Sequence, residues 1–392
     1  MSENIMKKVI FINSHPIQYF APMYSYMNKQ GAQLATWYSS SGVIHGGLDN
    51  EFGVNIKWDV PLLDGYDYQF FTNHSWSTAR HHSFWGLVNL SMILELFRIP
   101  KSVLVIHGWQ FFTHLAIIML GKLTGHTVCF RNEASFSHEQ LKSGWKQVLK
   151  RLGLKYVLFP RINYFLYIGN QNRLFYQSYG IADKRLIHCP YAVDNDRFST
   201  ANRQAVISKA TLAIPAADKI ILYSGKYIAK KRPMDLLQAF KNLDANNCWL
   251  IMVGEGELRK EMEKYINMHD IQRVILTGFI NQSAIADYYA MSDVFVMCSS
   301  VGETWGLSVN EAMNFNLPVI VSDLTGCSDD LIEEGSNGYV FKTGDITDLT
   351  VKLKRVLLDD DLSWRKSSKE VVAEYSYSTV LSTVLSIPGV RN

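Results

Sequence analysis

A chain of 392 residues is too long for one ordinary core and suits two domains of about 150–200 residues each. Hydrophobic residues make up 47% of it, which is enough to bury two cores. The 39 basic and 36 acidic residues leave a net charge of only +3. The sequence therefore lacks the concentrated basic field of a protein that binds nucleic acid without sequence preference. Five scattered cysteines with no Cys-x-x-Cys pair predict free thiols in a reducing, cytoplasmic compartment.

One apolar stretch needs a decision between a membrane span and a buried core. Val103–Gly121 contains no Asp, Glu, Lys or Arg and is long enough on paper to cross a bilayer. His107, Gln110 and His114 interrupt it. These polar residues favour a buried strand, a turn and a buried helix over a transmembrane segment.

Short apolar runs alternate with helical patterns in the first half of the chain. The predicted strands are Lys8–Ile12, Ser102–Ile106, Thr127–Phe130 and Tyr164–Ile168. The predicted helices include Ala21–Lys29, Phe111–Leu123 and Glu139–Leu158. Continuous apolar strands between helices are typical of a parallel sheet covered by helices on both faces.

A polar, irregular stretch, Asp196–Ala210, separates this half from a second one with the same alternation. The predicted strands of the second half are Lys219–Ser224, Trp249–Val253, Val274–Leu276, Val294–Met297, Pro318–Val321 and Gly338–Phe341. The predicted helices are Pro233–Leu243, Glu257–Met268, Gln282–Met291 and Leu307–Phe315. The sequence thus predicts an α/β protein with two doubly wound, Rossmann-like domains, residues 1–198 and 199–370, followed by a C-terminal helix in residues 371–392. We expect the ligand crevice outside the carboxyl ends of the strands, between the domains.

The strongest functional signal is the stretch Glu303–Glu311, which follows the strand 294–297 and opens a helix. Gly306 allows close approach of the backbone to a ligand, and the first amides of the helix would face an anion. The carboxylates at both ends suit vicinal hydroxyls. The stretch therefore predicts a ligand with sugar hydroxyls on both sides of a diphosphate. The alternative is an ordinary acidic helix start, in which Glu303 favours the N-terminus and Glu311 is simply exposed.

A second signal is a cluster of four cations within seven residues, on the loop that follows the strand 220–223. The cluster consists of Lys226, Lys230, Lys231 and Arg232. Cations at a helix start oppose the helix dipole, so neutralisation of a diphosphate explains them better than helix stabilisation. The alternative is a solvated basic loop. No Gly-x-x-x-x-Gly-Lys-Ser/Thr sequence occurs, so this is not a Walker loop.

These two segments resemble the signature of the family 4 glycosyltransferases, which are retaining enzymes of the GT-B fold. The Glu-x7-Glu motif of the family matches Glu303 and Glu311. Its Gly-Arg/Lys-x5-Lys pattern resembles Gly225, Lys226 and Lys231, with one residue fewer in between. Further segments follow in the family's order, namely Cys189–Phe198, Val253–Gly256, Leu276–Ile280 and Ala290–Val296. The loop Ser14–Phe20 resembles that of a bacterial subgroup found among polysaccharide and lipid-linked sugar genes.

The resemblance implies a role for each matched residue. Lys226 and Lys231 would hold the donor diphosphate and stabilise its charge as it leaves. Glu303 would hold the hydroxyls of the donor sugar, and Glu311 the ribose. The other donor contacts would come from Gly225 in the phosphate loop, from the backbone of Phe279 and Ile280 at the base, and from the backbone of Thr304, Trp305, Gly306 and Leu307 at sugar and phosphate. In the family the last helix crosses back to the first domain.

The acceptor is expected on the first domain, on three loops that leave strand ends on the ligand side. The candidate contacts are His15, Gln18, Tyr19, His107, Trp109, Arg131 and Glu133. Ordinary loop packing is the alternative for each of them. His15 is the candidate for deprotonating the acceptor hydroxyl, and Glu133 is the candidate nucleophile. The family often has a His where this sequence reads Phe-Arg-Asn-Glu at residues 130–133.

The predicted function is glycosyl transfer from a UDP- or GDP-type sugar to a saccharide or lipid-linked acceptor, with retention, in surface polysaccharide biosynthesis. Cations and amide dipoles can stabilise the diphosphate leaving group, so we expect neither a metal nor another cofactor. The Asp194-x-Asp196 pattern lies in the linker and is interpreted as coincidence. Three alternatives remain: a nucleotide-sugar 2-epimerase of the same fold, a catalytically inactive sugar-nucleotide-binding protein, and an inverting enzyme that uses His15.

A basic and aromatic stretch, Lys142–Arg161, indicates peripheral contact with a membrane. Lys142, Lys146 and Lys150 share a helical face that would attract anionic lipid, with Trp145 near the interface. The protein is thus expected in the cytoplasm, at the inner face of the plasma membrane. The alternative is a solvated face of a soluble domain.

Overall fold

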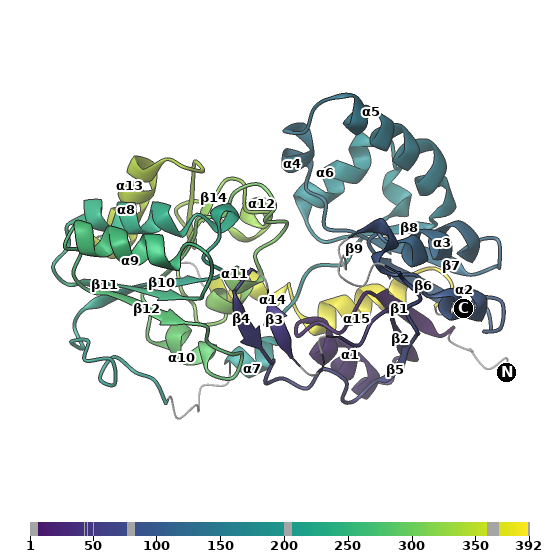
Figure 1. Ribbon diagram of the computed structural model, residues 1–392, viewed down its shortest axis with the longest axis horizontal. Helices are drawn as coiled ribbons and strands as arrows, with labels where there is room; N and C mark the ends of the chain where they lie inside the picture. Colours follow the sequence, from purple (N-terminus) through teal and green to yellow (C-terminus); the bar gives the residue numbers. More distant parts are fainter. Residues whose placement is uncertain are drawn as a thin grey trace. The chain divides into compact units, whose positions relative to one another are not determined.

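The computed structural model describes residues 7–42, 44, 46–49, 51–76, 83–199, 206–358 and 368–390 (Figure 1). The chain divides into two compact units. The first unit comprises Met1–His45, Pro61–Tyr191 and Tyr377–Asn392, and the second comprises Gly46–Val60 and Ala192–Ser376. Each unit has its own sheet, which confirms the predicted pair of parallel-sheet α/β domains.

The first unit is built on a parallel sheet with the strand order β5-β2-β1-β6-β7-β8-β9. Its strands are β1 Val9–Asn13, β2 Leu34–Tyr38, β5 Asp67–Phe70, β6 Val103–His107, β7 Thr127–Arg131, β8 Tyr164–Tyr167 and β9 Leu186–His188. Its helices are α1 Phe20–Lys29, α2 Leu90–Glu95, α3 Phe112–Gly121, α4 Phe136–Gln140, α5 Trp145–Leu152, α6 Asn170–Ser178 and α15 Tyr377–Ser386. The continuous apolar runs form the central strands, where they are buried on both faces.

The stretch Val103–Gly121 is the strand β6, a turn and the helix α3, as predicted. Within the described part of the chain, no helix has the length and apolar character needed to cross a membrane. The residues Val103 to Ile106 are fully buried in the sheet.

The second unit holds a parallel sheet with the strand order β12-β11-β10-β13-β14-β15. Its strands are β10 Lys219–Ser224, β11 Cys248–Val253, β12 Val274–Gly278, β13 Val294–Met297, β14 Val319–Ser322 and β15 Gly338–Phe341. Its helices are α7 Asn195–Ser199, α8 Pro233–Leu243, α9 Arg259–Met268, α10 Ile285–Ala290, α11 Leu307–Met313, α12 Ser328–Leu331, α13 Ile346–Leu358 and α14 Ser368–Ala373. Helices α8, α9 and α13 lie on one face of the sheet (Figure 1).

Both sheets reverse their strand order at one point. In the second unit the chain moves from β10 outward to β11 and β12, then returns to β13 on the other side of β10. In the first unit β1 and β6 have the same relation. In doubly wound sheets, ligands bind beside the loops that follow such strands at their carboxyl ends.

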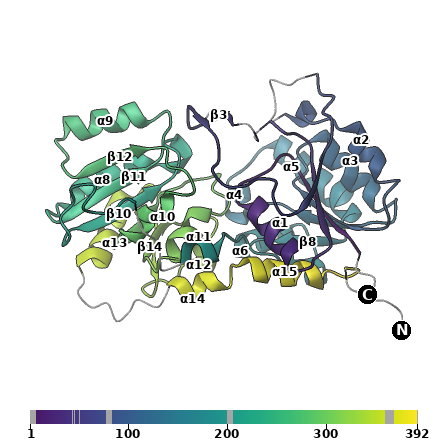
Figure 2. The same ribbon diagram turned by 90° about the horizontal axis from the view of Figure 1, so that it is seen from below.

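The C-terminal helix crosses back to the first unit, as predicted. Helix α15 packs against α1, and the Tyr26 and Tyr377 rings lie 5.8 Å apart (Figure 2). Thr383 Oγ1 donates a hydrogen bond to the carbonyl of His188, at 3.0 Å. The preceding helix α14 contacts α11 and belongs to the second unit.

The structure differs from the sequence prediction in one assignment that matters for the site. Residues 46–60 were predicted to lie within the first domain, but they belong to the second unit. They form an antiparallel hairpin of β3 Gly47–Asp49 and β4 Val54–Ile56. Of the predicted linker, residues 200–205 lie outside the described residues.

Candidate active site

The loops that follow β10 and β13 meet at the reversal point of the second sheet. The carbonyl of Lys230 accepts hydrogen bonds from the Ser300 amide (2.7 Å) and hydroxyl (3.0 Å). Lys231 forms an ion pair with Glu303, and Ser299 Oγ donates to Glu303 Oε2 at 3.1 Å. The Lys231 and Glu303 side chains are only 19% and 13% exposed, so water screens the pair weakly. The structure thus brings together a cation and an acid from the two motifs.

The turn Val253-Gly254-Glu255-Gly256 supports the lysine loop from behind. Gly225 donates its amide hydrogen to the Val253 carbonyl (3.0 Å), and Tyr227 donates to the Glu255 carbonyl (2.8 Å). A Cβ on Gly254 would lie 1.9 Å from the Gly225 carbonyl oxygen, and its φ of +151° suits glycine. Close backbone packing therefore requires a glycine at this position.

Gly306 has a φ of +106° and caps the start of α11 in the left-handed region. A Cβ there would meet the Met297 sulfur at 2.8 Å, so the loop packs closely on β13. The Trp305 ring is buried and donates to Asn310 Oδ1 at 2.8 Å. Its side chain therefore braces α11. Donor contacts through the backbone of Thr304 to Leu307 stay a prediction.

Glu311 lies inside the second unit. Its side chain is buried on α11, and its Oε2 accepts a hydrogen bond from the Tyr289 hydroxyl at 2.8 Å. The alternative that Glu311 is simply an exposed acid of a helix start is therefore wrong. Its contact with a ribose stays a prediction.

Lys226, the first lysine of the loop, is held by the β3–β4 hairpin. Its Nζ lies 3.1 Å from both carboxylate oxygens of Asp49 and 2.7 Å from Glu51 Oε2. The same ammonium lies 4.7 Å from the centre of the Phe52 ring. These hairpin residues follow no motif in the sequence, and the sequence prediction missed them.

The predicted base loop, Phe279 and Ile280, follows β12 and also contacts the hairpin. The Phe279 ring is met edge-on by Phe52 and Trp58, with centroid distances of 5.3 and 5.8 Å. The hairpin thus touches the loops predicted to hold both ends of the donor nucleotide.

The predicted acceptor residues lie at the carboxyl ends of β1, β6 and β7, which are neighbours in the sheet of the first unit. His15, Gln18 and Tyr19 follow β1, Trp109 follows β6, and His107 is the last residue of that strand. His15 Nδ1 lies 2.9 Å from the Ser14 hydroxyl. The edge-on contact between His107 and Phe20 has a centroid distance of 5.0 Å.

Arg131, at the end of β7, is buried. Its guanidinium donates to Cys189 Sγ (2.6 Å) and to the Pro190 carbonyl (3.1 Å), and lies 5.0 Å from the Tyr191 ring centre. Tyr191 in turn donates its hydroxyl hydrogen to Glu133. Arg131 thus braces the chain after β9, and Tyr191 orients Glu133 beside the strand ends. Direct contact of either residue with an acceptor stays a prediction.

Two histidines near this edge, the buried His114 and the half-buried His107, have lowered pKa values. The Nδ1 of His114 donates to the His107 carbonyl at 3.1 Å, and burial lowers the pKa of His114 to about 4. Burial, helped by the charges of Arg131 and His114, lowers the pKa of His107 well below its usual value. At neutral pH both rings therefore add no charge to the site.

These lowered pKa values predict that the first unit loses stability in mild acid. Below about pH 6.5 the unfolded chain binds protons that the folded histidines do not, so stability falls as pH drops, by about 1.4 kcal/mol per pH unit for each histidine. Replacing His114 with Asn keeps an N–H donor but removes the titration. We expect the free energy of unfolding, measured by denaturant titration between pH 7 and 5, to fall less steeply with pH in His114→Asn than in wild type. Equal slopes would contradict the prediction.

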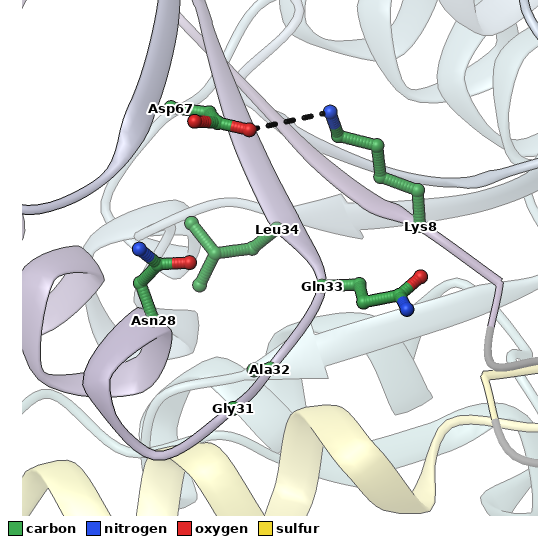
Figure 3. Close-up of a pocket in the computed structure, with 7 residues that line it drawn as sticks. All are labelled: Lys8, Asn28, Gly31, Ala32, Gln33, Leu34 and Asp67. Atoms are coloured by element: carbon green, nitrogen blue, oxygen red, sulfur yellow. Dashed lines mark ion pairs between the residues drawn. The ribbon is translucent and has the colours of Figure 1, made fainter.

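One open surface pocket lies elsewhere on the first unit (Figure 3). Lys8, Gln33 and Asp67 line it, and these residues sit at the amino ends of β1, β2 and β5. It is therefore on the edge of the sheet opposite the candidate acceptor loops. The 3.6 Å pair between Lys8 and Asp67 spans it.

Comparisons with known proteins find one matching family model and several relatives. The family model of the glycosyl transferases group 1 matches residues 207–375. The chain is 30% identical over 156 residues to N-acetyl-alpha-D-glucosaminyl L-malate synthase of Bacillus anthracis, which is 39% of this chain and 40% of that protein. It is 28% identical over 181 residues to UDP-Gal:alpha-D-GlcNAc-diphosphoundecaprenol alpha-1,3-galactosyltransferase of Escherichia coli, which is 44% of this chain and 46% of that protein. Each match thus spans less than half of the relative's length.

The whole chain has a counterpart among solved structures. Anabaena HepE in complex with UDP and glucose superposes with a TM-score of 0.71 at 13% identity, covering 96% of this chain and 98% of that chain. At this identity the likeness shows the fold alone. Residues 207–375 therefore match the glycosyl transferases of group 1, and the chain as a whole has the two-domain GT-B fold.

Proposed function

We propose that this protein is a glycosyltransferase that moves a sugar from a nucleoside-diphosphate donor of the UDP or GDP type to a saccharide or lipid-linked acceptor. Transfer proceeds with retention at C1 and without a metal, and serves the synthesis of surface polysaccharide. The Lys231–Glu303 pair at the reversal point of the second sheet carries the proposal. It joins a group suited to a phosphate and a group suited to sugar hydroxyls at the edge where ligands bind.

The chemistry assigns each group a step. The bond between C1 and the diphosphate oxygen breaks, and C1 gains oxocarbenium character. Lys226 and Lys231 neutralise the departing diphosphate, while Glu303 holds the sugar. The acceptor oxygen forms its bond to C1 on the face that the diphosphate leaves. Its proton passes to the diphosphate or to His15.

The relatives support both substrate classes of the proposal. The solved complex of HepE contains UDP and glucose. The name of the Escherichia coli relative gives a UDP-sugar as donor and a diphosphoundecaprenol-linked sugar as acceptor. Both descriptions fit a diphosphate site on the second unit and an acceptor edge on the first.

Donor screening by mass spectrometry tests the function. Purified protein is incubated with a panel of UDP- and GDP-sugars, with and without saccharide and lipid-linked acceptors. We expect one donor to be consumed only when acceptor is present, with the sugar's mass added to the acceptor. Conversion of the donor sugar without acceptor would indicate the 2-epimerase instead. Tight nucleotide binding without turnover would indicate the inactive binding protein.

We propose in addition that α5 docks on an anionic membrane. None of its residues is buried. Four exposed apolar side chains of α5 recur at helical spacing: Trp145, Val148, Leu149 and Leu152. Exposed apolar residues that flank the helix extend this face, namely Leu141 before it and Tyr156 and Val157 after it. Lys146 and Lys155 lie over the rings of Trp145 and Tyr156, where their charges would meet lipid headgroups. Lys142 and Lys150 instead form ion pairs with Glu139, which reduces their attraction to anionic lipid. The apolar face therefore contributes more to membrane binding than these two lysines.

Vesicle sedimentation tests the membrane surface. Wild type should bind phosphatidylglycerol vesicles, and Trp145→Glu/Leu149→Glu should bind at least tenfold more weakly, since each buried apolar side chain contributes about 2 kcal/mol. Leu123→Glu is the matched control, because Leu123 is 70% exposed in the same unit outside this face. Equal binding of the double variant and wild type would contradict the proposal.

A further inference from the structure

The β3–β4 hairpin has no role in the function proposed so far, yet it contacts the lysine loop and the base loop of the second unit. We infer that it is a working part of the donor site and that Asp49 is a positioning residue, which holds Lys226 where the diphosphate leaves. The inference rests on the proposed function and adds residues from a part of the chain outside the group 1 match.

Asp49 is a fixed anion. Its Oδ1 accepts hydrogen bonds from the amides of Glu51 (2.9 Å) and Phe52 (3.0 Å) in a tight turn. Burial alone would raise the pKa of Asp49, but the Phe52 amide and Lys226 outweigh it and lower this pKa. The carboxylate is therefore ionised at neutral pH and is anchored by its own backbone.

This anchored carboxylate fixes the lysine. A lysine side chain is a flexible four-carbon stem that ends in a compact charge. Without these contacts, the ammonium of Lys226 would therefore sample many positions. Two contacts of 3.1 Å to Asp49 and the Phe52 ring at 4.7 Å restrict its ammonium. An ammonium has three N–H donors, and the two oxygens of Asp49 and one oxygen of Glu51 engage them here. Departure of Glu51 would therefore free donor capacity for a diphosphate. Preorganised charge of this kind stabilises a leaving group without reorganisation during the reaction.

Glu51 differs from Asp49 in exposure. It lies 2.7 Å from Lys226 and 3.6 Å from Lys230, but its side chain is 49% exposed. Glu51 can therefore turn into solvent when a diphosphate takes its place, whereas the anchored Asp49 remains.

The other side of the hairpin is anchored on the base loop. Asn281 Nδ2 donates to the Lys57 carbonyl at 2.7 Å, and the Ser283 amide donates to Asp59 Oδ2 at 3.1 Å. Together with the Phe52 and Trp58 contacts to Phe279, these bonds fix the hairpin at two points. These contacts hold the hairpin on the base loop while Asp49 contacts Lys226.

A double-mutant cycle tests the inference in the full chain. Asp49→Asn keeps the acceptor for the turn amides but removes the charge that holds Lys226. We expect kcat for sugar transfer to fall about 10- to 100-fold while the donor KM changes less than threefold, because an ångström of misplacement costs that much in rate. In a Lys226→Met background, Asp49→Asn should have no further effect, since it acts through that lysine.

The control and the adverse outcomes are distinct. The control Glu334→Gln removes a different ion pair of the second unit, in which Glu334 Oε1 lies 2.6 Å from Lys352 Nζ. This variant should leave kcat unchanged. A lower donor KM in Asp49→Asn with unchanged kcat would overturn the inference, because Asp49 would then merely compete with the donor. Equal losses in both backgrounds would assign Asp49 a structural role and also overturn it. Wild type without transfer to any acceptor would overturn the proposed function as well.

Discussion

Replacing Lys231 with Met should lower kcat/KM for sugar transfer by about 10²- to 10³-fold, the usual cost of removing one preorganised group that stabilises charge at a leaving atom. Lys231 is 19% exposed and pairs with Glu303, so its charge acts in a partly desolvated site. The loss should fall mainly on kcat, since the charge on the diphosphate grows as the bond to C1 breaks. Initial rates with the identified donor and acceptor measure it.

Two further variants separate chemistry from folding. Lys260→Met removes a lysine from an exposed position on α9 and should leave the rate unchanged. Lys231→Arg keeps the charge next to Glu303 and should restore part of the rate. Circular dichroism and thermal unfolding check that Lys231→Met is folded. A folded Lys231→Met with the wild-type rate would remove this lysine from the donor site.

The sequence predicts elements best where one local signal is strong. The bounds of β10, α8, β13 and β15 agree with the prediction residue for residue. Each of these strands contains a continuous apolar run, and α8 begins with Pro233 at its first position. By contrast β5, Asp67–Phe70, lies at the edge of its sheet with three exposed residues and shows no apolar run. No local pattern marks such a strand.

The candidate site also has a part that the sequence predicts and a part that it does not. Lys231 and Glu303 follow β10 and β13, and because neighbouring parallel strands end at the same edge, their motifs could be placed together from the sequence. Lys226 and Asp49 are 177 residues apart. Their contact depends on a hairpin that leaves the first half of the chain and joins the second unit. Neither residue spacing nor composition carries that information, so only the folded structure reveals it.

Gly254→Ala should destabilise the second unit by about 3–5 kcal/mol and also impair transfer. The new Cβ would lie 1.9 Å from the Gly225 carbonyl oxygen, and backbone cannot turn aside as a side chain can. The turn must therefore move away from the loop that carries Lys226, which would shift the lysine from its place. Thermal unfolding measures the stability, and initial rates measure kcat/KM. We expect both the unfolding temperature and kcat/KM to fall.

Gly335→Ala separates the steric clash from the cost of the backbone conformation. Gly335 has a φ of +73° in the same unit, but a Cβ there meets no atom within 4 Å. That variant should cost about 1–2 kcal/mol, the penalty of an L residue in a left-handed conformation, and should leave transfer intact. If Gly254→Ala cost no more than Gly335→Ala and kept the wild-type rate, the turn would not hold the lysine loop in position. A larger cost with a lower rate would tie the glycine turn to the placement of the phosphate-binding lysines.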